Sequence, residues 1–91
     1  MSTKEFNQKL DDLLNNVKII DDSIINQFDE AYNYDAASSI NWLISKLRII
    51  KSRLESGGNL TIELKNKSIN VNKETFYSFV NERYPDISKD I

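Results

Sequence analysis

The sequence contains neither cysteine nor histidine, and it has only two glycines and one proline among its 91 residues. Without cysteine there is no disulfide framework and no thiolate nucleophile, and without histidine there is no imidazole base. Together these absences exclude a zinc site of the usual nitrogen and sulfur type. The two glycines are adjacent, at Gly57 and Gly58, so a glycine-rich phosphate-binding loop is missing as well. The composition therefore predicts a protein without enzymatic activity and without a cofactor.

A pair of carboxylates is the feature that comes nearest to a metal site. Asp22 and Asp29 are seven residues apart, which places them on one face of a helix, and carboxylate oxygens are typical ligands of divalent cations. No third ligand follows at a suitable spacing, so we expect no metal ion here.

Long apolar runs are also absent. No stretch approaches the roughly 18 residues of a membrane-spanning helix, and the first residues lack the apolar core of a signal peptide. We therefore expect a cytoplasmic protein with no membrane partner. The chain has room for one hydrophobic core, so we expect a single domain over residues 1–91.

Charge is distributed unevenly along the chain. Residues 1–39 carry three lysines against eight acidic residues, whereas residues 40–73 carry seven basic residues against two acidic ones. The overall net charge of −2 therefore hides an acidic half and a basic half. Two unlike surfaces attract charged partners or pair with each other in an assembly.

The first third of the sequence has the apolar spacing of an amphipathic helix. Steps of four and three residues alternate along an apolar seam that consists of Phe6, Leu10, Leu13, Val17, Ile20 and Ile24. We expect the first four of these residues in the core. The segment from Asp21 to Ser23 offers a new N-cap within this stretch. Residues 3–33 therefore form either one bent helix or two helices, and we favour a break near residues 20–23.

A second helix is predicted from Ala36 to about Glu55, with Asp35 as its N-cap and Gly57-Gly58 as its left-handed stop. Its apolar seam consists of Ile40, Leu43, Leu47, Ile50 and Leu54, and we expect the last four of these residues in the core. Arg53 in the last turns suits the negative end of the helix dipole.

Beyond this helix the apolar period changes to two, which is typical of β-strands. We predict a β-hairpin over about residues 60–71, with a loop at Asn66-Lys67 that pairs Ile62 with Val71. This pairing places the apolar residues of both strands on one face.

The end of the sequence predicts one short helix over about residues 73–83, capped by Asn72 and followed by Pro85. We expect the tail, residues 86–91, to be frayed. The fold class is therefore α+β and predominantly helical, with two or three N-terminal helices, one β-hairpin and one short C-terminal helix.

The second helix carries the side chains that we expect to contact a partner. Large aromatic and basic residues among small polar ones are typical anchors of protein interfaces. The predicted contact surface consists of Trp42, Ser45, Lys46, Ile49 and Arg53. In the alternative arrangement, the hairpin or the short C-terminal helix of the same chain covers Trp42 and Ile49.

These features favour a non-enzymatic macromolecular binding module that acts through protein–protein contact. We expect a small regulator or inhibitor of the kind that phages or mobile elements encode, with an unidentified protein as its partner. The surplus of apolar seam on so short a chain favours self-association, with a homodimer as the first expectation.

The alternative function is DNA binding by a winged-helix-like regulator, because three helices followed by a two-stranded wing give that layout. The contacts to nucleic acid would then come from Arg48, Ser52, Lys65 and Lys67. A third possibility is binding of a small ligand between subunits, next to Tyr32 and Tyr34.

Overall fold

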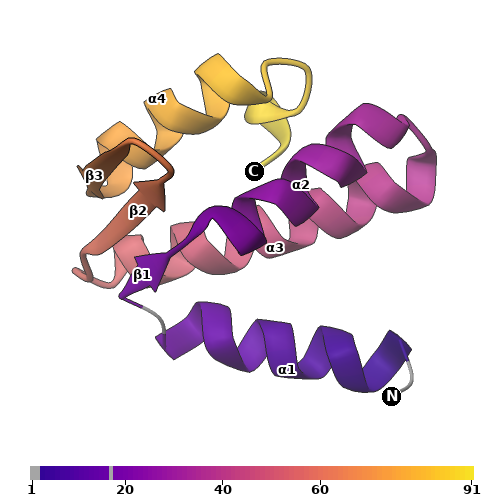
Figure 1. The fold of residues 1–91 in the computed structure, drawn as a ribbon, viewed down its shortest axis with the longest axis horizontal. Helices are drawn as coiled ribbons and strands as arrows, with labels where there is room; N and C mark the ends of the chain where they lie inside the picture. Colours follow the sequence, from indigo (N-terminus) through magenta and orange to yellow (C-terminus); the bar gives the residue numbers. More distant parts are fainter. Residues whose placement is uncertain (1–2, 17) are drawn as a thin grey trace.

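The computed structural model describes residues 3–16 and 18–91, and these form four α-helices, a three-stranded sheet and a short 3-10 helix (Figure 1). In chain order the elements are α1 (Thr3–Asn16), β1 (Ile19–Ile20), α2 (Asp22–Tyr34), α3 (Ala37–Glu55), β2 (Leu60–Leu64), β3 (Lys67–Val71), α4 (Lys73–Arg83) and η1 (Ser88–Asp90). The predicted α+β, predominantly helical class is confirmed.

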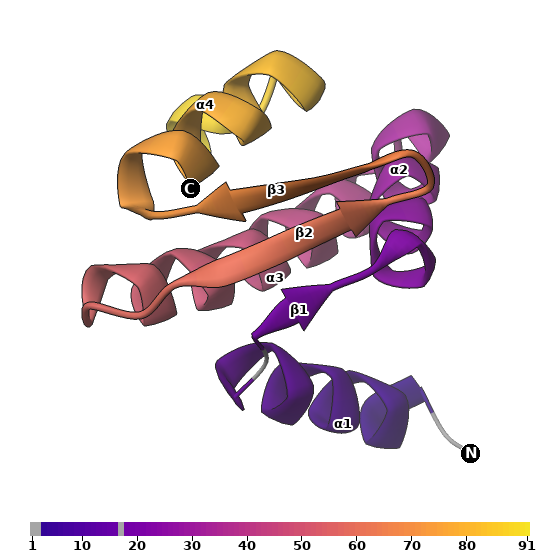
Figure 2. The same ribbon diagram turned by 60° about the vertical axis from the view of Figure 1, so that its left-hand side comes forward.

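Helix α3 is the centre of the fold, because α1, α2 and α4 all pack against it. The strand order is β1-β2-β3, and Figure 2 shows α1 beyond the β1 side of the sheet and α4 beyond the β3 side. The predicted core seam of α3 is confirmed: its four leucine and isoleucine side chains are buried, at Leu43, Leu47, Ile50 and Leu54. Apolar residues of the hairpin and of α4 complete the same core.

Residues 3–33 contain two helices, which settles the choice that the sequence left open. The carboxylate of Asp21 caps α2, since it accepts hydrogen bonds from the backbone of Ser23 at 3.0 Å and of Ile24 at 3.4 Å. The bond from the Ser23 side chain and these backbone bonds lower the pKa of the Asp21 carboxyl. The break therefore lies where the expected N-cap stands.

The segment before this cap is a strand, which the sequence analysis missed. Ile19 and Ile20 were expected to continue the first helix, but they form β1, which runs parallel to β2. The backbone N–H of Thr61 donates to the carbonyl of Lys18 at 2.8 Å and extends this pairing. Two adjacent β-branched residues favour an extended backbone, and the predicted hairpin is thus part of a three-stranded sheet.

The buried face of α1 also differs from the prediction. Leu10 and Leu14 are buried, whereas Phe6 and Leu13 of the expected seam remain 40% and 47% exposed. Val17, the next residue of that seam, lies outside the described residues. Helix α1 is therefore rotated relative to the predicted seam.

The turn between α2 and α3 assigns a different role to Asp35. This residue is the C-cap of α2 in the left-handed conformation, with φ 55°, and Ala36 is the N-cap of α3 without a side-chain hydrogen bond. Aspartate tolerates this conformation better than most residues with a Cβ. At the other end, Gly57 has φ +89°, which confirms the predicted left-handed stop.

The hairpin has the predicted period but another register. Ile62 pairs with Ile69 rather than with Val71, and the turn is Lys65-Asn66 rather than Asn66-Lys67. The shift is two residues, so each side chain stays on the face that was predicted. A pattern of period two does not distinguish registers that differ by two.

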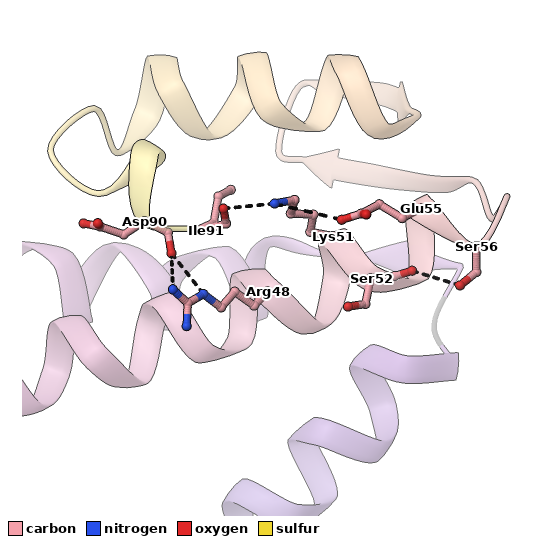
Figure 3. Close-up of polar contacts among 7 residues, drawn as sticks. All are labelled: Arg48, Lys51, Ser52, Glu55, Ser56, Asp90 and Ile91. Carbon is pink, nitrogen blue, oxygen red and sulfur yellow. Dashed lines mark hydrogen bonds and ion pairs between the residues drawn. The ribbon is translucent and has the colours of Figure 1, made fainter.

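The C-terminal residues are ordered against α3, although we expected them to be frayed. Ile87 and Ser88 are buried. The guanidinium of Arg48 donates to the carbonyl oxygen of Asp90 at 2.9 and 2.6 Å, and Lys51 donates to the carbonyl oxygen of Ile91 at 3.0 Å (Figure 3). These long-range contacts hold the tail in place.

Candidate interaction site

Two of the five residues predicted to contact a partner join α3 to α1 instead. The ammonium of Lys46 forms an ion pair of 2.5 Å with Asp11, and the side chain of Lys46 is only 5% exposed. The indole N–H of Trp42 donates to the side-chain oxygen of Asn7 at 2.7 Å. The Lys46 ammonium also lies 5.6 Å from the centre of the Trp42 ring, within range of a cation–π interaction.

The rest of the predicted surface is only partly accessible. Ser45 is exposed, whereas Ile49 is half-buried and packs against the core, and Arg53 is half-buried near the end of α3. Trp42 is half-buried, and its ring meets the ring of Phe28 from α2 edge-on, with the ring centres 6.0 Å apart. Helices α1 and α2 thus cover part of the Trp42 side chain, whereas the alternative arrangement expected the hairpin or the C-terminal helix to cover it.

The residues proposed for nucleic acid fall into two groups. The guanidinium of Arg48 donates to the carbonyl oxygen of Asp90 (Figure 3). Ser52 lies one helical turn further along α3, and its carbonyl oxygen accepts a hydrogen bond of 3.1 Å from the Ser56 hydroxyl. Lys65 and Lys67 are exposed at the hairpin turn. Among the described residues, neither of these two lysines takes part in an ion pair.

A second polar cluster joins α2 to the end of α4, and the sequence analysis did not find it. Arg83 donates to both carboxylate oxygens of Asp29, at 2.9 and 2.7 Å, and the Tyr84 hydroxyl donates to Oδ1 at 2.6 Å. Tyr32 adds a bond of 3.0 Å from its hydroxyl to Asp86. The bonded residues are 54 or 55 positions apart in the sequence, so no local sequence pattern predicts that they meet.

These contacts change the acidity of the groups involved. Burial raises the pKa of the Asp29 carboxyl, but the hydrogen bonds from Arg83 and Tyr84 and the guanidinium charge outweigh burial, so this pKa lies below its ordinary value. Burial, together with the bond to Asp29, raises the pKa of the Tyr84 hydroxyl. Asp29 is therefore a charged anchor for α4.

The exposed apolar side chains concentrate on the N-terminal region. Phe6 and Leu13 are seven residues apart on α1 and share one face of that helix, and Ile19 of β1 is 49% exposed. Tyr34 and Tyr77 are exposed on α2 and α4. The sequence analysis had assigned Phe6 and Leu13 to the core, so their exposure was not anticipated.

A groove of about 270 Å³ lies between the hairpin and the C-terminal half of α4. Its lining mixes apolar and charged side chains and consists of Leu64, Lys67, Ile69, Phe79, Glu82 and Arg83. Residues 3–16 and 18–91 contain no group of three or more acidic side chains that could hold a metal ion. Within the same residues, no helix has the length and apolar character needed to cross a membrane.

Comparisons of the chain with models of protein families, with curated proteins and with solved structures find no match.

Proposed function

We propose that the protein is a non-enzymatic protein-binding module that self-associates through the exposed apolar face of α1. The observation that carries this proposal is the orientation of α1, which exposes Phe6 and Leu13 while it turns the polar Asn7 and Asp11 toward α3. A rotation that buried Phe6 would break the bonds of Asn7 and Asp11 to α3. The apolar face therefore stays outward and available to a second chain.

The size of the protein supports a role for this face. A chain of about 90 residues has a small margin of stability, and apolar side chains that remain in water contribute nothing to it. In a homodimer the same two side chains would become buried, at roughly 25 cal/mol for each Å² of apolar surface removed from water. Catalysis is not proposed, because the chain lacks histidine and cysteine.

Such a module acts by occupying a macromolecular partner, in the manner of a small regulator or inhibitor from a phage or mobile element. The partner is proposed to be a protein. The acidic N-terminal half and the basic hairpin turn give the module two charged regions that steer association.

Sedimentation velocity of the double variant Phe6→Gln, Leu13→Gln tests self-association. We expect the wild-type chain to sediment as a dimer at about 50 µM and the variant as a monomer with unchanged circular dichroism, since both side chains are exposed. The variant Tyr77→Gln is the control, because Tyr77 is 44% exposed on another helix. A wild-type monomer at this concentration, or a dimer that survives both changes, would refute the proposal.

DNA binding remains a second candidate, and the exposure of Lys65 and Lys67 at the turn favours it. If both lysines contact phosphates, the slope of log K against log salt should decrease by about 2 in the Lys65→Ala, Lys67→Ala variant. Absence of duplex binding at about 50 mM salt would eliminate this candidate.

A further inference from the structure

Strand β3 forms a free edge of the sheet. The strand order is β1-β2-β3, so β3 pairs with β2 on one side only. Leu64 and Lys67 flank a two-residue turn and form a hydrogen-bonded pair, and bonded pairs alternate along an antiparallel ladder. The backbone N–H and C=O groups of Ser68 and Asn70 therefore project away from β2, toward the outside of the sheet.

The groove described above runs beside this edge. Ile69 of β3 and Phe79 of α4 are half-buried and line it, so both keep apolar surface that a further side chain would cover. Figure 2 shows β3 as the outer strand of the hairpin, with α4 beyond it. An extended segment beside β3 would bond to the free backbone and place alternate side chains toward the groove.

Basic side chains stand at both ends of the edge. Lys65 lies in the turn before β3, and Lys67 is the first residue of β3. Lys73, just beyond the other end of the strand, is the first residue of α4. All three are exposed, and none makes an ion pair within the described part of the chain. Acidic residues at both ends of the bound segment would complement these charges.

The same charges argue against a second copy of β3 as the occupant. In the two-fold register that pairs Ile69 with its own copy, Lys65 of one chain would lie opposite Lys73 of the other, and like charges at this distance repel. Nucleic acid fits less well, because the outward face of the hairpin, formed by Thr61, Glu63, Ser68 and Asn70, offers no aromatic side chain for base stacking.

We propose that the free edge of β3 binds an extended acidic segment of a partner protein as a fourth strand of the sheet, with an apolar side chain of that segment in the groove beside α4. This surface is separate from the apolar face of α1, so the inference goes beyond the proposed self-association.

Titration of the ¹⁵N-labelled protein with two peptides tests the charge preference. The probes are acetyl-EVTVTVE-amide and its basic counterpart acetyl-KVTVTVK-amide, each up to about 1 mM at low salt. We expect the acidic peptide to bind at least about tenfold more tightly, and to protect the amides of Ser68 and Asn70 from hydrogen exchange. The variant Lys65→Glu, Lys67→Glu should lose that preference.

Two variants at Ser68 test the backbone contact. Ser68→Pro removes an outward N–H group, which an edge strand tolerates, and it should weaken the acidic peptide at least about tenfold. Ser68→Ala keeps the N–H group and should bind like the wild type. If Ser68→Pro fails to fold, a peptide with N-methyl groups on one edge replaces it and should not bind.

Four results would overturn the inference. Two of them concern affinity: no change in the amide signals of Ser68 and Asn70 at the highest concentration of the acidic peptide, or equal affinity for the basic peptide. The other two concern the location: peptide binding that maps to α1, or protection of the β3 amides from hydrogen exchange that depends on protein concentration without any peptide. Tight binding of a thymidine oligonucleotide to the same lysines without protection of these amides would assign the surface to nucleic acid instead. Because the Phe6→Gln, Leu13→Gln variant leaves β3 intact, peptide binding and self-association can fail independently.

Discussion

The ion pair between Lys46 and Asp11 provides the sharpest test of how α1 is held. Its ammonium end is buried, with the Lys46 side chain 5% exposed, whereas the Asp11 side chain is 33% exposed. Removal of one partner from a fully buried pair costs about 3–5 kcal/mol, because it leaves a buried charge without a counter-charge. The two possible deletions should therefore differ in their cost.

The variant Asp11→Ala leaves the buried ammonium unpaired. Because water reaches Asp11, we take the lower end, about 3 kcal/mol, and subtract about 0.5 kcal/mol for the better helix propensity of alanine. The expected loss in the free energy of unfolding is thus about 2.5 kcal/mol. Lys46→Met replaces the buried charge by an apolar chain of similar length and leaves a carboxylate that water can solvate, so it should cost about 1 kcal/mol or less.

Urea unfolding of both single variants and of the double variant measures the coupling. Trp42 is the only tryptophan and lies beside the pair, so its fluorescence reports directly on this contact. In the Lys46→Met background, Asp11→Ala should cost less than about 0.5 kcal/mol, which gives a coupling of roughly 2 kcal/mol. Equal costs of Asp11→Ala in the two backgrounds would show that the ion pair does not hold α1 against α3.

Three further variants test the core, the second polar cluster and the turn after α3. Leu14→Ala should lower the free energy of unfolding by about 3 kcal/mol and Leu13→Ala by less than about 0.5 kcal/mol, since only Leu14 is fully buried; similar urea midpoints for the two variants would contradict this orientation of α1. The pKa of Asp29 is lower in the folded state than in the unfolded chain, so its stabilisation is present at neutral pH and is lost as the pH falls below about 4. The stability difference between wild type and Asp29→Asn, measured by unfolding at pH 7 and at low pH, should shrink accordingly, and a constant difference would refute this role. Gly57→Ala should cost about 1 kcal/mol in thermal unfolding because φ is +89°, and a stabilising effect would exclude that backbone conformation.

Periodicity predicted the elements of this fold well and their partners poorly. The second helix ends at Glu55 as expected, and Asn72 caps α4 through a capping box with Thr75. These features depend on residues within a few positions of each other, so the sequence displays them directly. The register of the hairpin depends instead on which of two equivalent pairings packs better, and an alternating pattern carries no information on that choice.

The orientation of α1 shows why hydrophobic spacing alone assigned Phe6 and Leu13 to the core although they are exposed. The apolar seam through Phe6 and Leu13 is the more regular one, but Asn7 accepts a bond from the half-buried indole of Trp42 and Asp11 pairs with the buried ammonium of Lys46. Leaving those two donors without acceptors would cost more than leaving two apolar side chains half in water. Because the partners are 35 residues away, the sequence pattern could not reveal this competition.

Part of the separation of charge along the chain is used within the molecule. Asp11 and Asp29 from the acidic half bind Lys46 and Arg83, and each pair anchors one helix to another. The lysines of the hairpin turn have no such partner in the described residues, so their charge is available for association at the sheet edge. Exposed charges are screened within about 10 Å at 0.1 M salt, whereas buried pairs are screened much less. Added salt should therefore weaken partner binding at β3 while it leaves the fold stable, and equal sensitivity of both would mean that the internal pairs are more accessible to solvent than their burial indicates.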